Sequence, residues 1–174
     1  MALSPSSMAS YIYGHVQGSK EASVAISKFY QALCSYCEEN MEIQYSWAAT
    51  TPSPPSPIPD PITLLSCKIK TSGSLSPSGA TTPEAALSKF AADLNSQISG
   101  WQVIWPTGFV LQSAFILPAI VFTPSMATTP EEAWEHIAKE IIAGITVAAT
   151  PGPLLGTHGI YTVPTPGALW IKTV

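Results

Sequence analysis

"ATTPE" begins two stretches of this chain, ATTPEAALSKFAADLNSQI (residues 80–98) and ATTPEEAWEHIAKEIIAGI (residues 127–145). The two stretches start 47 residues apart and are identical at 8 of 19 aligned positions. In each, a Thr is followed by a Pro, Thr82 by Pro83 and Thr129 by Pro130. These residue types are typical of the N-cap and of the first position of a helix, where a missing N–H costs nothing. The sequence therefore predicts two sharply started helices, over residues 83–98 and 130–145.

The apolar faces of these two predicted helices also correspond. A shift of 47 residues places five apolar positions of the first on apolar positions of the second: Leu87 on Trp134, Phe90 on Ile137, Ala91 on Ala138, Leu94 on Ile141 and Ile98 on Ile145. In the second stretch Thr129 and Glu132 have the spacing of a capping box. A predicted strand and a loop precede each helix, which favours a duplicated βα unit. The alternative is that two unrelated segments independently have residues that begin a helix at a defined position.

Hydrophobic periodicity predicts the remaining elements. Apolar residues recur at three and four over residues 19–41, which predicts a helix, and residues 6–18 can form a short helix of their own with a break at Gly14 or Gly18. We predict strands at residues 62–70, on both sides of a turn at 106–108, and in a hairpin about residues 164–167. The apolar run 109–122 contains Pro118 and is shorter than the roughly 20 residues of a membrane-spanning helix, so we interpret it as a buried strand.

These elements define an α+β fold. We expect a mixed or antiparallel sheet of about 4–6 strands with the helices packed on one face. The expected organisation is an N-terminal helical segment (residues 1–49), a Pro-rich linker or arm (residues 50–61) and an α+β body (residues 62–174), which contains both strand-loop-helix units and the C-terminal hairpin.

The Pro-rich segment, TTPSPPSPIPDP (residues 50–61), contains six prolines. Proline lacks an N–H and fixes φ, so the segment favours an extended polyproline II conformation and has a length of roughly 35 Å at about 3.1 Å per residue. Two roles remain open. It is either an inert linker, or an arm or Pro-rich ligand that lies on another protein through Pro54, Pro55 and Pro57.

The charge content of the chain is its most informative property. Charged residues make up 10% of the sequence and the net charge is −4, whereas about 25% is usual for soluble domains. Because interface cores are depleted in Lys, Glu and Asp, this predicts a surface that is covered in a homo-oligomer or a larger assembly. The alternative is a secreted or neutral monomer. Three tryptophans on predicted strands are further interface candidates, with ordinary core packing as the alternative: Trp101, Trp105 and Trp170.

The basic residues argue against nucleic acid and membrane as partners. All seven are Lys, and they are scattered along the chain. The chain therefore lacks Arg, the residue that makes bidentate contacts with phosphates and bases. It also has no continuous row of basic residues that could follow a phosphate backbone or an anionic membrane. The odd number of cysteines and the lack of a signal-peptide pattern at the N-terminus predict a reducing compartment.

Few residues carry a chemical signature. CSYC (residues 34–37) has the spacing of a redox pair, but it lies in the last turns of a predicted helix, where the helix dipole opposes a thiolate, and this favours a packing role. A zinc site needs two further ligands, and the only candidates in the sequence are Cys67 and a distant His. The stripe formed by Glu132, His136 and Glu140 lacks the H-E-x-x-H order and is typical of a solvated helix face.

We therefore predict no catalytic residue, no cofactor and no metal, and expect that the chain is not an enzyme. An enzyme or metal protein that uses His136 or the Cys34/Cys37 pair is the weakest hypothesis. In its low charge and its abundance of Ser, Thr and Pro the chain resembles, in general style, small virion components of tailed bacteriophages or large DNA viruses. That likeness implies a neck, tail, baseplate or capsid-associated subunit, located in a virion that is assembled in the host cytoplasm. The alternative is a small cytoplasmic adaptor recognised through its Pro-rich segment.

Overall fold

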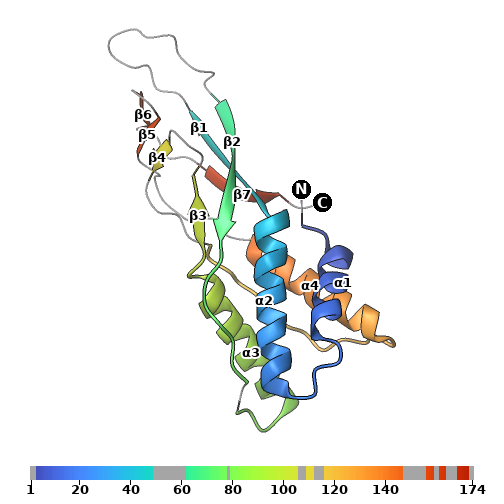
Figure 1. The fold of residues 1–174 in the computed structure, drawn as a ribbon. Coiled ribbons are helices and arrows are strands. Elements are labelled where there is room, and N and C mark those ends of the chain that lie inside the picture. The colour runs from blue at the N-terminus through green and yellow to red at the C-terminus, as the bar shows by residue number, and fades with distance from the viewer. Residues whose placement is uncertain are drawn as a thin grey trace.

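A computed structural model describes residues 3–48, 62–77, 79–105, 109–111, 116–146, 156–158, 161–163 and 168–172, with side chains for residues 3–44, 66–77, 79–105 and 116–145. The predicted α+β class is confirmed. Figure 1 shows the helices gathered at one end, with strands β1 and β2 extending away from them. In this part of the chain the elements are α1 (Pro5–Val16), α2 (Ala22–Asn40), β1 (Glu42–Ala48), β2 (Ile62–Lys70), α3 (Pro83–Ile98), β3 (Gln102–Ile104), β4 (Phe109–Leu111), α4 (Pro130–Thr146), β5 (Gly156–His158), β6 (Tyr161–Val163) and β7 (Ala168–Lys172).

The starts of α3 and α4 are those that the sequence predicts. The Thr82 hydroxyl accepts a hydrogen bond from the Ala85 N–H at 3.2 Å. In α4 the Thr129 hydroxyl accepts from the Glu132 N–H at 3.2 Å, and the Glu132 carboxylate accepts in return from the Thr129 N–H at 3.3 Å, which completes the capping box. The N–H and hydroxyl of Thr128 also donate to this carboxylate. Both helices are therefore fixed locally, by residues within one turn of their first positions.

Hydrogen bonding at this cap changes the acidity of Glu132. The backbone N–H of Thr128 is the largest of several hydrogen-bond donors that lower the pKa of Glu132. Because the pKa is lower in the folded than in the unfolded chain, the carboxylate stabilises the fold at neutral pH, above its unfolded pKa. That contribution is lost as the pH falls through the folded pKa.

The N-terminal region forms two helices, as predicted. Helix α1 continues through Gly14, and the break falls only at Gly18, which adopts the left-handed conformation with φ of 78°. This conformation has no steric cost for glycine. The residues before α1 are held against α2 because the Tyr36 hydroxyl donates to the Ser4 carbonyl at 3.2 Å and lies 3.4 Å from the Ser4 N–H. Leu3 is fully buried there.

The strands form two antiparallel sheets, in the orders β3-β2-β1-β7 and β4-β5-β6. Strand β1 was not predicted, although it lies inside the larger sheet. One predicted hairpin is wrong, and the two strands predicted on either side of a turn have separate partners. The strands flanking residues 106–108 do not pair with each other, since β3 pairs with β2 and β4 with β5. The strands flanking residues 164–167 also separate, since β6 pairs with β5 and β7 with β1. Strand β6 pairs with the strand immediately before it in the sequence, whereas β3, β4 and β7 pair with strands that are distant in sequence.

The Pro-rich segment joins two neighbouring strands. Ala48, at the end of β1, lies opposite Ile62, at the start of β2. Residues 49–61 lie outside the described residues, but their two ends are therefore adjacent. The side chains of α1, α2 and β1 share one core cluster with those of β2, α3 and α4.

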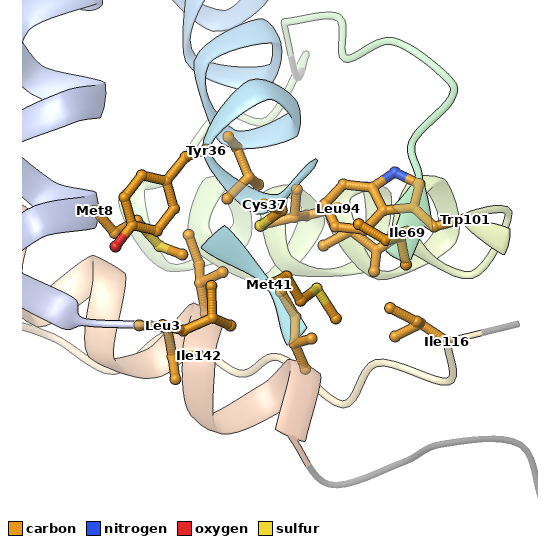
Figure 2. Close-up of a cluster of buried hydrophobic side chains, with 14 of the residues drawn as sticks. Leu3, Met8, Tyr36, Cys37, Met41, Ile69, Leu94, Trp101, Ile116 and Ile142 are labelled. Atoms are coloured by element: carbon orange, nitrogen blue, oxygen red, sulfur yellow. The ribbon is translucent and has the colours of Figure 1, made fainter. Parts of the chain in front are cut away.

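The core lies where the helices meet the near ends of β1 and β2. Figure 2 shows Leu3 and Met8 from the N-terminal region, Cys37 from α2, Leu94 from α3 and Ile142 from α4 converging on it. Trp101 and Ile116 lie at its other end, with Met41 between the two groups (Figure 2). Burial of a side chain of this size contributes about 1.5–3 kcal/mol. Segments between Leu3 and Ile145 are thus held in one cluster.

One core segment is not in regular structure. We define the strap as residues 116–129, between β4 and α4. Among the described residues of the predicted strand 109–122, β4 is a strand, whereas residues 117–122 are not. Pro118 cannot donate to a strand ladder. The strap bonds to helices instead: the Ile120 N–H donates to the Asn95 side-chain oxygen at 2.8 Å, the Asn95 amide donates to the Ile120 carbonyl at 2.9 Å, and the Ala119 N–H donates to the Gly144 carbonyl at 2.9 Å.

Gly144 permits this close approach of strap and helix, and Gly144→Ala tests it. A Cβ at this position would lie 2.5 Å from the Ile120 Cα and 2.6 Å from its backbone nitrogen. We expect a loss of about 1–3 kcal/mol in the free energy of unfolding, measured by urea denaturation, because backbone atoms must move. Gly14→Ala is the matched control, since nothing lies within 4 Å of its added Cβ. It should gain about 0.5–1 kcal/mol from helix propensity. Equal stabilisation by both substitutions would contradict the close packing.

Candidate functional site

The predicted interface residues are placed differently from one another. Trp101 is fully buried, and its indole N–H donates to the Tyr30 hydroxyl at 3.0 Å. It belongs to the core and has no surface to offer a partner, so its designation as an interface residue is corrected. Trp105 is half-buried against the core. Trp170 lies in β7 opposite Gln44, with its side chain outside the described part. The three candidate prolines also lie outside the described residues: Pro54, Pro55 and Pro57.

The cysteines occupy packed positions. Cys37 and Cys67 are buried and Cys34 is half-buried, all three as free thiols. Burial raises the pKa of Cys34 and Cys37, and raises the pKa of Cys67 to about 12. At neutral pH these thiols are therefore protonated and weakly nucleophilic. Among the residues that the structure describes, no group of three or more His, Cys, Asp and Glu side chains is arranged to hold a metal ion.

The stripe of Glu132, His136 and Glu140 is not simply a solvated face. Glu132 is engaged in the α4 cap. The Glu140 carboxylate accepts hydrogen bonds from the N–H of Thr123, at 2.9 Å, and from its hydroxyl. His136 Nε2 lies 3.3 Å from the same carboxylate oxygen and 3.3 Å from the Thr123 carbonyl. Because the strap covers this part of α4, only 15% of the Glu140 side chain is exposed, and the solvated interpretation is wrong for this residue.

The strap also lines a largely apolar groove of about 360 Å³ between it and α3. We call this the α3–strap groove. Its lining combines the outer face of α3 with strap residues: Glu84, Leu87, Ser88, Ala91, Ala92, Asn95, Ile120, Val121, Phe122 and Pro124. Phe122 stacks on Phe90 of α3 with ring centroids 5.4 Å apart, which fixes the floor of the groove against the core.

Large apolar side chains remain exposed along this groove. Val121 is 69% exposed and Leu87 is 38% exposed. On the strap, Leu117 and Val121 point outward whereas Ile116 and Ile120 are buried. Further along the strap Met126 is 96% exposed. An apolar surface that continues over two elements is typical of an interaction site, whereas isolated exposed apolar residues are ordinary.

The electrostatics of the groove suit an apolar occupant. Glu84 is the one ionisable residue in its described lining. The nearby Lys89 and Asp93 on α3 form an exposed ion pair with each other at 2.6 Å. Most of the other lining residues are apolar, so the groove is suited to contact with apolar groups. Sequence reasoning missed the groove because it treated the run 109–122 as buried on both faces.

No protein-family model, curated protein or solved structure matches this chain. No helix in the described ranges combines the length and the hydropathy needed to cross a bilayer.

Asn95 forms one wall of the groove, and Asn95→Ala tests that role. The substitution leaves the Ile120 N–H and carbonyl without their partners. We expect a loss of about 2–4 kcal/mol in unfolding free energy, since each unsatisfied buried group costs about 1–3 kcal/mol. Hydrogen exchange at the Ile120 amide should accelerate in parallel. Ser96→Ala, at an exposed position of the same helix, is the control and should change neither quantity. Unchanged protection of the Ile120 amide in the Asn95 variant would contradict this role.

Proposed function

We propose that this chain is a non-catalytic structural subunit that assembles by packing against other copies of itself, with the α3–strap groove as part of the packing surface. The observation that carries the proposal is the run of exposed apolar side chains along this groove, in a chain with only 10% charged residues. Apolar surface gains about 25 cal/mol per Å² when it leaves water. Val121 and Leu87, the large apolar residues of the groove lining that are exposed, are therefore stabilised when they are covered.

A second copy is the occupant that fits the groove best. Interface cores are depleted in charged residues because desolvation of an unpaired charge is costly. Another copy of this chain brings a surface with the same low charge content, including the exposed Met126 and Leu117 of its own strap. The packing of such surfaces requires few charges to leave water.

The setting that we propose is a virion, with this chain as a neck, tail, baseplate or capsid-associated subunit. Its support is compositional: few charges, seven Lys as the only basic residues apart from His, and 17 prolines. Such a composition suits subunits whose surfaces lie on neighbouring subunits and not on nucleic acid.

At the level of the fold, we propose that α3 and α4 descend from one duplicated unit. They have matching Thr-Pro starts and lengths of 16 and 17 residues. The segments that precede them differ, since α3 follows β2 and its loop, whereas α4 follows the strap. Packing of the helices on one face of a sheet of about 4–6 strands is part of the same proposal.

Val121→Asp and Leu87→Asp test the assembly. A carboxylate in the groove must be desolvated on contact, so we expect each to weaken self-association by about tenfold to one-hundredfold, or about 1.4–2.8 kcal/mol. The measurement is molar mass as a function of concentration, by light scattering or sedimentation. Val24→Asp is the control, because Val24 is 41% exposed on α2 and lies outside the groove.

Two results would overturn the proposal. One is a wild-type chain that remains a single-copy species at high concentration, which would favour the adaptor hypothesis. The other is self-association that is equally strong in the Val121, Leu87 and Val24 variants, which would place the contact elsewhere.

A further inference from the structure

Helix α1 has a hollow on each flank. The first lies between α1 and α4 and has a volume of about 320 Å³. We call it the α1–α4 groove. Its α1 side is made mostly of small residues, and its α4 side carries two carboxylates and a tryptophan. The lining residues that matter here are Tyr13 and Gly14 from α1, and Glu131, Trp134 and Glu135 from α4. The Tyr13 and Trp134 rings have centroids 6.4 Å apart.

This combination of groups suits a cation on an aliphatic stem. A lysine stem packs along aromatic rings while its ammonium reaches a carboxylate or a ring face. Glu135 already pairs with Lys139 of its own helix at 3.1 Å. The Glu131 side chain is exposed and makes no hydrogen bond or ion pair with the described residues. Both oxygens of the Glu131 carboxylate can therefore accept hydrogen bonds from an incoming ammonium group.

The second hollow, of about 480 Å³, lies between α1 and α2 and has the opposite charge. Its lining contains Lys28 and His15, and none of its lining residues is acidic: Gly14, His15, Lys28, Gln31, Ala32 and Ser35. Lys28 is exposed and has no carboxylate partner in the part of the chain that is described. Lys89 and Lys139, by contrast, are paired with Asp93 and Glu135. Gly14 lines both hollows, so the two surfaces flank the same helix.

We propose that copies of this chain join head to tail across α1, with the exposed Lys28 side chain of one copy seated in the α1–α4 groove of the next. The inference rests on the self-assembly proposed above and names a second pair of surfaces for it. Charge complementarity selects the occupant: an acidic, aromatic groove and a basic surface with an unpaired lysine occur on the same chain. The small residues of α1 allow the neighbouring backbone to approach closely.

This arrangement determines the symmetry of the assembly. The two surfaces differ, so each copy uses one toward the preceding subunit and the other toward the following subunit. Contacts of this kind generate rings when the rotation closes and filaments when it does not, whereas a two-fold dimer uses the same patch twice. Assemblies of more than two copies are the expected product.

A charge-reversal experiment tests the pairing. Lys28→Glu places like charges opposite each other at every contact, and so does Glu131→Lys. We expect each variant alone to lose self-association by at least about tenfold. In an equimolar mixture every contact between the two variants joins opposite charges, either the native pair or the reversed pair, so assembly should return. Light scattering on each variant and on the mixture gives the readout.

Two controls separate charge complementarity from folding. Lys68→Glu makes the same charge change at an exposed position of β2 and should assemble as the wild type does. Glu131→Gln removes the carboxylate without adding a repulsive charge, and should show an intermediate loss. The helix content of all variants, measured by circular dichroism, should match the wild type.

The outcomes distinguish this inference from the proposed function. Restored assembly in the mixture, with masses above two copies, supports the head-to-tail contact. No recovery in the mixture, unaltered assembly of the Lys28 variant, or a limit of two copies overturns it. If the Val121 variant dissociates while the Lys28 and Glu131 variants do not, assembly through the α3–strap groove stands and only the head-to-tail contact fails. A wild-type chain that is always monomeric overturns both.

Discussion

The strap packs against the core without a neighbouring strand, so the N–H and carbonyl groups on its inner side must find hydrogen-bond partners elsewhere in the protein. Helices α3 and α4 supply these partners, and their positions depend on these hydrogen bonds. Buried backbone groups that remain unpaired are costly. The Asn95 side chain presents an acceptor and a donor in the way that a strand backbone does, and both are used by Ile120. On the other side, Gly144 lets the strap approach α4 closely enough for its carbonyl to accept from Ala119. The strap is thus a shared partner of two helices.

This constraint explains why apolar side chains remain at the surface. Because the strap lies between two helices, its inward side chains, Ile116 and Ile120, complete the core (Figure 2 shows Ile116 at its edge). Its outward side chains have no further layer above them in the described structure. The same backbone arrangement that satisfies the core therefore produces the α3–strap groove. Stability and the proposed packing surface depend on the same contacts.

The sequence predicted those parts of the fold that depend on local interactions. The starts of α3 and α4 were found because Thr82, Thr129 and Glu132 act within one turn of the helix. Strand β1 was missed although Ile43, Tyr45 and Trp47 alternate with polar residues, which is the usual period-two signal. The predicted hairpin about residues 164–167 was wrong because a strand of three residues, such as β6, carries too little pattern to identify its partner. The α3–strap groove could not be predicted from the sequence, because it depends on the Asn95 side-chain amide taking the place of a hydrogen-bonded neighbouring strand.

The effect of the low charge content depends on which charged side chains already have partners within the chain. Many of the described ionic groups are engaged within the chain: Glu132 caps α4, Glu140 holds the strap, and Glu38 accepts from the N–H of Thr71 at 2.9 Å. A chain with so few charges left unengaged has little long-range electrostatic attraction or repulsion across most of its surface. Each remaining charge then has more influence on the orientation in which two copies meet, because complementary charges affect specificity more than affinity. Apolar contact and charge therefore have separate roles in such an assembly, since apolar burial supplies the stability and the few unengaged charges supply the direction.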